Sequence, residues 1–299
     1  MRAHSSSLPS LVIGGPTASG KTQLALEIAQ RCGGAIINAD AFQIYRGLPL
    51  LTAQPTAEEL AQAPHHLVGE IPLSQSFDAA CYLALARERL TQCRATGRLP
   101  ILVGGTGLYI KALLYGLSEG LPGPDANLRA DLEQQPLDAL RTRLATLDPE
   151  AIATVDLQNP RRVIRALEVC ILTGKAFTSF RLTAPWCEPP IGIWVSPKRE
   201  DLHQRIAGRA GRLFASGVEE EVRRALPEVG MTSQQTIGLK QVASVLEGTC
   251  SREEAISQIT AATRQYARRQ ETWLRKEAAL VAIPPEQALE KGLSLLKDQ

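Results

Sequence analysis

The sequence lacks the features that mark metal-stabilised, secreted or membrane-embedded proteins. Its six cysteines are scattered, and no two have the C-x-x-C spacing that would suggest a zinc site or a disulfide framework. No H-E-x-x-H motif occurs. No signal-peptide pattern is visible, and no run approaches the roughly 20 apolar residues of a membrane span. We therefore expect a reduced, soluble, cytoplasmic protein without membrane contact.

Net charge is also almost absent, although the basic residues are unevenly distributed. The chain has 299 residues and a formal net charge of +2, which by itself predicts no partner. Residues 161–181 nevertheless contain five basic residues and one acid, and a second basic cluster spans residues 264–276. Such clusters indicate either a polyanion-binding surface or solvated helix faces. A hydrophobic share of 44% allows a sizeable core, in one large domain or two smaller ones.

A phosphate-binding loop is the clearest motif in the chain. The segment fits G-x-x-x-x-G-K-[ST] and consists of Gly15, Pro16, Thr17, Ala18, Ser19, Gly20, Lys21 and Thr22. An apolar run precedes it and a helical pattern follows it, so backbone N–H groups and a helix N-terminus would converge on an anion. Lys21 would offer its charge to a phosphate, and Thr22 its hydroxyl to Mg²⁺. The alternative is a chance match in a Gly-rich turn.

Two further apolar runs predict strands beside this loop. Residues 35–37 lead to Asp40, which would lie at the carboxyl end of a parallel strand, where ligands of α/β proteins bind. The alternative role for Asp40 is a helix N-cap. Residues 99–103 lead instead to Gly104-Gly105-Thr106-Gly107. Many P-loop NTPases have a Mg²⁺-binding acid at such a strand end, so its absence here argues against ATP hydrolysis.

The pattern predicts an α/β protein with a P-loop NTPase-like parallel sheet flanked by helices and an inserted all-helical domain. Composition changes near residue 121, and the following segment to about residue 190 contains helical patterns without strands. In it, Asn159 followed by Pro160 predicts a helix start. We assign residues 1–121 and 189–299 to the catalytic core and residues 122–188 to the insertion. Residues 1–10 are expected to form a loose tail, and residues 185–190 a return linker.

The last third of the chain predicts a strand at residues 191–195 that rejoins the sheet, followed by helices. Ser251 and Glu254 form a capping box that opens a long helix. On that helix Ile259, Tyr266 and Trp273 repeat every seven residues, a stripe that favours core packing over ligand contact. Residues 280–283 predict a last strand. Residues 41–63 are expected to be rich in loops.

Several motifs in their order resemble one known family, the tRNA isopentenyltransferases. The motifs are the P-loop, Asp40 with Gln43 and Tyr45, residues 63–67, 103–109 and 159–168, Gly238, and residues 263–275. The resemblance covers about residues 11–276 and is closest to the bacterial type, the tRNA dimethylallyltransferases. The P-loop alone is generic, whereas the ordered set is specific.

The resemblance implies a reaction and a set of catalytic residues. Members of the family transfer a dimethylallyl group from dimethylallyl diphosphate to N6 of the adenosine 3′ of the anticodon, position 37, in tRNAs that read codons beginning with U. Diphosphate is released, so the P-loop would hold the leaving group. Asp40 matches the family's general base. Lys21, Thr22 acting through Mg²⁺, and Arg223 match residues that stabilise the departing diphosphate.

The resemblance also implies a set of tRNA contacts. Separately, we expect the protein to be a monomer. The matching positions lie in three short segments and at two single residues: Asp40, Ala41, Phe42 and Gln43; Thr106; Arg129; Arg161, Arg162, Val163, Ile164 and Arg165; Gln235, Thr236, Ile237, Gly238, Leu239 and Lys240. The sequence departs from the family at Ala41, where Ser is common, and at Leu239, where Tyr is common. These departures put single contacts in doubt but leave the base in place.

Two other functions are compatible with parts of this pattern. A small-molecule kinase would use Lys21 and Thr22 on ATP, although the glycine-rich end of the third strand and the basic insertion argue against it. A non-enzymatic RNA-binding module would carry a vestigial nucleotide site, although the presence of Lys21, Thr22, Asp40 and Arg223 together argues against that. The sequence alone leaves both open.

Overall fold

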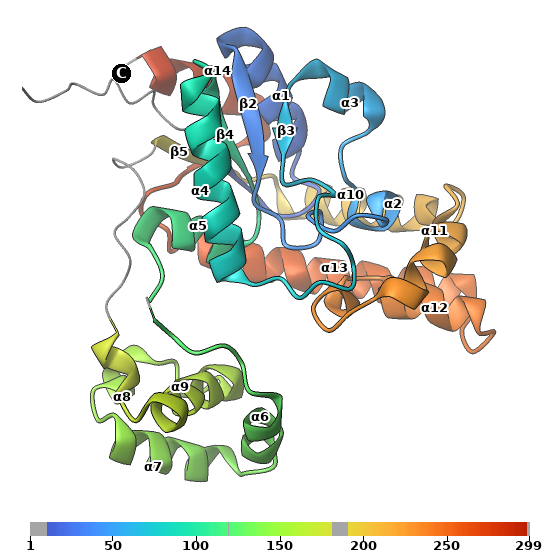
Figure 1. The fold of residues 1–299 in the computed structure, drawn as a ribbon. Coiled ribbons are helices and arrows are strands. Elements are labelled where there is room, and N and C mark those ends of the chain that lie inside the picture. Colours follow the sequence, from blue (N-terminus) through green and yellow to red (C-terminus); the bar gives the residue numbers. More distant parts are fainter. Residues whose placement is uncertain (1–10, 119, 181–190, 298–299) are drawn as a thin grey trace, which may run out of the picture. The chain divides into compact units, whose positions relative to one another are not determined.

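The computed structural model describes residues 11–118, 120–180 and 191–297, and the chain divides into two compact units. One unit comprises residues 1–114 and 186–299, and the other comprises residues 115–185 (Figure 1). The expected tail and return linker lie outside the described residues. The boundaries assigned from the sequence, at residues 121 and 189, stay a prediction. No helix in the described ranges is long and apolar enough to cross a membrane.

A six-stranded parallel sheet forms the centre of the first unit. Its strands are β1 (Leu11–Gly14), β2 (Gly34–Asn38), β3 (His65–His66), β4 (Leu99–Gly104), β5 (Ile191–Val195) and β6 (Val281–Ile283). The strand order is β3-β2-β4-β1-β5-β6, with neighbouring strands parallel. Central strands of such a sheet are buried on both faces, which is why β1, β2 and β4 are continuous apolar runs. The predicted fold class is confirmed, as are the expected strands at residues 191–195 and 280–283.

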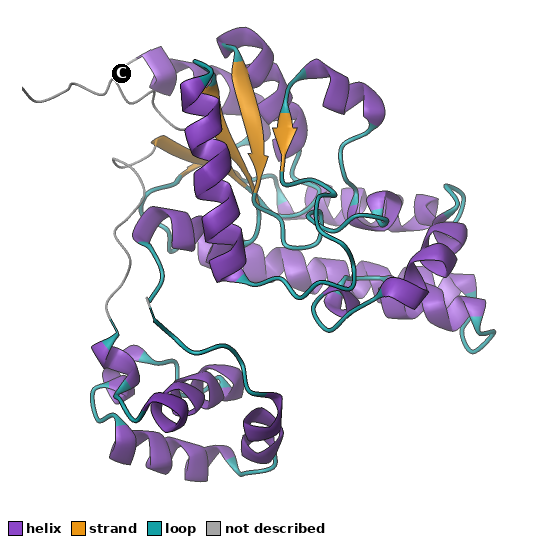
Figure 2. Ribbon diagram, viewed as in Figure 1, coloured by secondary structure: helices purple, strands orange, loops and turns teal. Residues whose placement is uncertain are grey.

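Helices cover both faces of this sheet. Helix α1 (Lys21–Cys32) and helix α14 (Pro285–Lys297) pack on one face, where Ile28 and Ala288 join a cluster with sheet residues such as Ile13 and Ile193. Helix α4 (Ala79–Ala95) packs on the other face against β2 and β4 (Figure 2). Asp78 caps the start of α4, because its side chain accepts hydrogen bonds from the N–H groups of residues 80 and 81. Helix α5 (Gly107–Tyr115) follows β4.

The segment between β2 and β3 is more regular than the sequence predicted. It contains helix α2 (Pro49–Thr52) and helix α3 (Ala57–Gln62). Helix α3 starts with a capping box in which Thr56 and Glu59 exchange hydrogen bonds. Both helices are short, so their apolar periodicity is too brief to distinguish them from loops.

A second group of helices lies at the carboxyl ends of the strands. It comprises α10 (Arg199–Leu213), α11 (Val218–Ala225), α12 (Leu239–Leu246) and α13 (Arg252–Leu274), with 3₁₀ turns at Leu226–Glu228 and Ser233–Gln235. Helix α13 packs against α10 and α12. Its capping box is confirmed, because Ser251 Oγ accepts a hydrogen bond from the Glu254 N–H at 3.2 Å.

The second unit contains helices and no strand within residues 120–180. The helices are α6 (Ala126–Glu133), α7 (Leu137–Leu147), α8 (Ala151–Thr154) and α9 (Pro160–Thr173), with a 3₁₀ turn at Phe177–Ser179. They share a core of their own, to which α9 contributes Val163 and Leu167. Asn159 caps α9 as expected, with its side chain accepting a hydrogen bond from the Arg161 N–H.

Candidate active site

The P-loop connects β1 to α1 in the way its sequence predicts. Gly20 has a φ of 93° and Ala18 a φ of 65°, so the loop uses the left-handed region at two positions before the helix begins. Lys21 is 8% exposed, and its Nζ donates to the carbonyl of Pro16 at 3.3 Å. Burial lowers the pKa of Lys21, an effect that the nearby Asp40 carboxylate opposes and Arg209 reinforces. The loop thus has a partly desolvated ammonium group at its base.

Asp40 follows β2 and lies beside the P-loop. It is 8% exposed. Its Oδ1 accepts a hydrogen bond from the Phe42 N–H at 3.0 Å, while its own N–H donates to Asn38 Oδ1 at 3.1 Å. A turn follows Asp40, so the alternative role as a helix N-cap is not realised. A carboxylate fixed by its own turn at a strand end is suited to accept a proton from a bound ligand.

Thr106 joins this turn from the end of β4. Its Oγ1 accepts a hydrogen bond from the Ala41 N–H at 2.9 Å, and its own N–H donates to the Ala39 carbonyl at 3.1 Å. Tyr266 Oη on α13 lies 3.4 Å from Thr106 Oγ1, and burial raises the pKa of Tyr266. Thr106 therefore holds the backbone on both sides of Asp40, and Tyr266 contributes a protonated hydroxyl.

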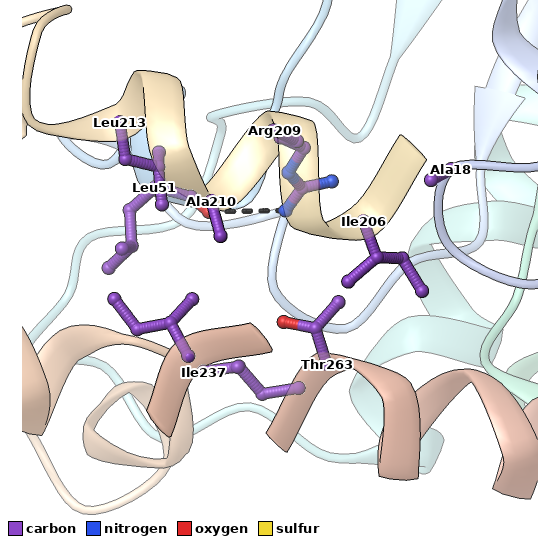
Figure 3. Close-up of a pocket in the computed structure, with 9 residues that line it drawn as sticks. Ala18, Leu51, Ile206, Arg209, Ala210, Leu213, Ile237 and Thr263 are labelled. Carbon is purple, nitrogen blue, oxygen red and sulfur yellow. Dashed lines mark hydrogen bonds between the residues drawn. The ribbon is translucent and has the colours of Figure 1, made fainter. Parts of the chain in front are cut away.

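Arg209, which the sequence interpretation did not include, brings a guanidinium to the P-loop. From helix α10 its Nη1 donates to Thr17 Oγ1 at 3.2 Å, and its Nη2 lies 3.5 Å from the Leu51 carbonyl (Figure 3). Burial lowers the pKa of Arg209, and Asp40 opposes the shift. One turn earlier, Arg205 approaches the Ser19 carbonyl at 3.5 Å. The i,i+4 spacing of two arginines on a predicted helix was the available signal.

Arg223, which the resemblance assigned to the diphosphate site, does not contact the P-loop within the described part of the chain. Its side chain is 61% exposed and pairs with Glu220 one turn earlier on α11. The reason is the phase of the helix: α11 buries Val218, Glu221 and Val222, so position 223 points to solvent. The arginine that lies beside the P-loop is therefore Arg209, and the assignment of Arg223 to the diphosphate stays a prediction that its position here does not favour.

Two adjoining pockets open beside the P-loop, and four residues line both of them. The more polar pocket includes Thr17, Asp40, Arg209 and Tyr266. The other is largely apolar; its walls include Ala18, Leu51, Ile206, Leu213, Ile237 and Ile259, and Figure 3 shows Ala18, Ile206 and Ile237 around the cavity. The arrangement can hold an anion at the loop, place an apolar group next to it, and offer a carboxylate to a third group.

The known proteins that are similar to this chain come from one family. The family described as IPP transferase matches residues 43–277. The chain is 43% identical over 289 residues to a tRNA dimethylallyltransferase of Anaeromyxobacter dehalogenans, with 92% of this chain and 94% of the relative covered. It is 41% identical over 280 residues to that of Geobacter sulfurreducens, with 90% of each covered.

The chain belongs to the tRNA dimethylallyltransferase family. A solved structure supports the same assignment: the tRNA isopentenylpyrophosphate transferase of Bacillus halodurans matches with a TM-score of 0.71 and 33% identity, over 97% of each chain. The family predicted from the sequence is therefore confirmed, and with it a prenyl-transferring class of enzyme.

The segments that match tRNA contacts in this family are only partly brought together at the pockets. Phe42, Thr236 and Ile237 line the polar pocket with Asp40, and Thr106 adjoins it. Gln43 instead uses its amide within the fold, donating to the Ala53 carbonyl at 2.8 Å. Of the remaining positions in residues 235–240, the side chains of Gln235 and Lys240 are exposed, whereas Leu239 is 3% exposed, and Gly238 has a φ of 95°. Leu239 therefore packs inward, and its departure from Tyr is a change within the core.

The matching residues of the helical unit also separate into two groups. Arg161 and Arg162 are exposed on α9. Val163 and Ile164, at 0% and 6% exposure, belong to the core of the unit, so the structure does not support RNA contact through their side chains.

Arg129 and Arg165 share a buried partner in Glu168, which is 0% exposed. Arg129 donates to both Glu168 oxygens at 2.9 Å, and Arg165 donates to Oε2 of the same carboxylate. Burial raises the pKa of Glu168, but the hydrogen bonds from Arg129 and Arg165 outweigh it, so the pKa is lowered. The side chains of Arg129 and Arg165 are 38% and 30% exposed, so both remain partly open to solvent.

Proposed function

We propose that this protein transfers the dimethylallyl group of dimethylallyl diphosphate to N6 of adenosine 37, 3′ of the anticodon, in tRNAs that read codons beginning with U. The main support for this proposal is the pair of adjoining pockets, which combine the P-loop, Arg209, Asp40 and an apolar wall. A kinase needs no apolar wall beside its phosphate site, whereas an allylic diphosphate has both parts.

The diphosphate would bind at the N-terminus of α1. Backbone N–H groups of the P-loop and the positive end of the helix dipole favour a dianionic group there. Lys21 and Arg209 add two positive charges, and partial desolvation increases what each contributes. The five-carbon group would then lie against Ala18, Ile206 and Ile237, where it is removed from water.

The residues present fit a magnesium ion bound together with the diphosphate. Thr22 supplies a hydroxyl at the start of α1, and Ser19 Oγ is buried without a hydrogen-bond partner among the described residues. Hydroxyl oxygens suit Mg²⁺, which is often held by few protein groups and by substrate phosphates. In keeping with that, the described chain has no group of three or more His, Cys, Asp or Glu side chains placed for a metal. When bound, Mg²⁺ would neutralise charge on the diphosphate.

Asp40 would accept the proton that the attacking amine loses. The adenine N6 forms a bond to C1 of the allyl group while the C1–O bond to diphosphate breaks, and the N6 proton passes to the carboxylate. The electron pair of the broken bond leaves with diphosphate, where Lys21 and Arg209 stabilise the developing charge. Thr106 and the turn at Ala41 keep Asp40 in position. The target base must leave its stack to reach such a pocket.

The helical unit would bind the RNA backbone. Arg161 and Arg162 are exposed, and Arg129 and Arg165 present guanidinium groups whose orientation is fixed by Glu168. Contacts of this kind supply affinity that falls as salt rises. We assign this task to the module at residues 122–188, in a monomeric, cytoplasmic enzyme.

A direct product assay tests the proposal. The protein is mixed with Mg²⁺, dimethylallyl diphosphate and an unmodified tRNA anticodon stem-loop, and the digested nucleosides are analysed by mass spectrometry. We expect adenosine 37 to gain one five-carbon unit, and a stem-loop with guanosine at that position to gain none. Product in a reaction with ATP and no RNA would favour a kinase, and binding of the stem-loop without any modification would favour an RNA-binding module.

A further inference from the structure

Helix α13 carries a buried glutamine that touches the P-loop. Gln270 is 4% exposed, and its Oε1 accepts a hydrogen bond from the backbone N–H of Thr17 at 2.9 Å. The two residues are 253 positions apart in the sequence. Thr17 also receives the hydrogen bond from Arg209 on its hydroxyl. A single P-loop residue is thus held from two helices, through its peptide by Gln270 and through its side chain by Arg209.

The amide of Gln270 occupies space that a glycine leaves free. A Cβ atom at Gly105 would lie 2.1 Å from Gln270 Nε2 and 2.7 Å from the Gly15 carbonyl oxygen, so a side chain at position 105 is incompatible with this packing. The Gly-Gly-Thr-Gly segment after β4 therefore admits the glutamine between itself and the P-loop. The same segment holds the turn of Asp40 through Thr106.

The same helix reaches the turn of Asp40 one helical turn earlier. Tyr266 Oη lies 3.4 Å from Thr106 Oγ1, and the Tyr266 ring lies 5.7 Å from that of Phe42. Gln270 and Tyr266 are four residues apart and so lie on one face of α13. That face contacts both the phosphate loop and the segment that carries the proposed base.

We infer that Gln270 is a positioning residue. It fixes the Thr17 peptide, so that the P-loop keeps both the shape that binds diphosphate and its position relative to Asp40. The inference rests on the proposed function. Without the glutamine the buried Thr17 N–H loses its acceptor, and the hydroxyl that orients Arg209 loses its fixed support. Diphosphate binding should weaken, whereas binding of RNA by the helical unit should not change.

The test measures binding of inorganic diphosphate in the presence of Mg²⁺ by calorimetry, on the full chain. Gln270→Leu has a similar volume and no acceptor, and Gln270→Met serves if the leucine variant does not fold. We expect Kd for diphosphate to rise about tenfold, the effect of leaving one buried donor unpaired. The matched control is Gln265→Leu, which alters an exposed glutamine of the same helix and should bind like the wild type.

Two further readouts separate positioning from mere packing. In the Gln270 variant, kcat/KM for dimethylallyl diphosphate should fall about tenfold, while KM for the stem-loop stays within a factor of about two. A folded variant with a lowered melting temperature but wild-type diphosphate affinity would overturn the inference. If the wild type itself binds no diphosphate, the proposed function fails, and the role of Gln270 fails with it.

Discussion

Replacing Arg209 with alanine should be far more harmful to catalysis than replacing Arg223, and the two variants test directly which arginine acts on the diphosphate. Arg209→Ala removes the guanidinium that donates to Thr17 Oγ1 at 3.2 Å and lines the polar pocket with Asp40. In the proposed reaction negative charge develops on the departing diphosphate. Removing one preorganised donor from such a site typically lowers kcat by about 10²- to 10³-fold, or about 3 to 4 kcal/mol.

The position of Arg209 places its expected effect toward the upper part of that range. Burial lowers the pKa of this guanidinium, which indicates a partly desolvated environment. A charge in such an environment interacts more strongly with a developing anion than a surface charge does. Arg223 instead is 61% exposed and pairs with Glu220 across one helical turn. Pairs of that kind contribute only about 0.3 to 0.5 kcal/mol.

The assay is single-turnover transfer to a stem-loop at saturating RNA, with dimethylallyl diphosphate varied. Arg223→Ala is the matched control, since it removes the same group from an exposed position and should change the rate by less than about twofold. Equal losses in the two variants, or a loss confined to Arg223→Ala, would refute the placement of Arg209 at the leaving group. Thermal melting of both variants excludes misfolding as the cause.

Four other changes have defined outcomes. Asp40→Asn should lower kcat by roughly 10²-fold or more with RNA affinity intact, and a wild-type rate would remove Asp40 from the mechanism. Arg165→Ala should reduce the slope of log K against log salt for stem-loop binding by about 1; an unaltered slope would mean that it touches no phosphate. Lys21 binds anions when it is protonated, and burial lowers its pKa below the ordinary 10.5. The affinity for diphosphate should therefore fall as the pH rises through this lowered pKa, and an affinity that stays constant up to pH 10.5 would contradict the prediction. Gly105→Ala should cost about 1 to 3 kcal/mol of stability and weaken diphosphate binding, whereas Gly211→Ala, with nothing within 4 Å of the added methyl group, should do neither.

Local signals in the sequence were sufficient for much of the fold. The strands at residues 11–14 and 99–104 follow from apolar runs, and the starts of two helices follow from the caps at Asn159 and Ser251. Each of these features depends on neighbouring residues alone. The P-loop belongs to the same class, because its anion site is made from one continuous segment.

Features that depend on the phase of a helix or on distant contacts were harder to predict. Arg209 and Arg223 both lie on helices that the sequence indicated, but only packing decides which arginine faces the P-loop. Tyr266 belongs to a seven-residue stripe that suggested core packing, yet it lines the polar pocket. The contact of Gln270 with Thr17 spans 253 residues, and no periodicity in the sequence reports it.

The glycines after β4 combine a local sequence signal with contacts to distant parts of the chain. From the sequence, their presence where many P-loop NTPases have an acid argued only against hydrolysis. The structure supplies a positive reason for each: a Cβ atom would lie 2.1 Å from the Ala39 carbonyl oxygen at Gly104, 2.1 Å from Gln270 at Gly105 and 2.3 Å from Trp273 at Gly107. An acid at position 105 would therefore displace the glutamine that holds the P-loop. That space is used instead to join the loop to the turn of Asp40. Among the described residues that line the polar pocket, Asp40 is the one acidic residue, which is why we propose it, and no residue after β4, as the group that meets the attacking amine.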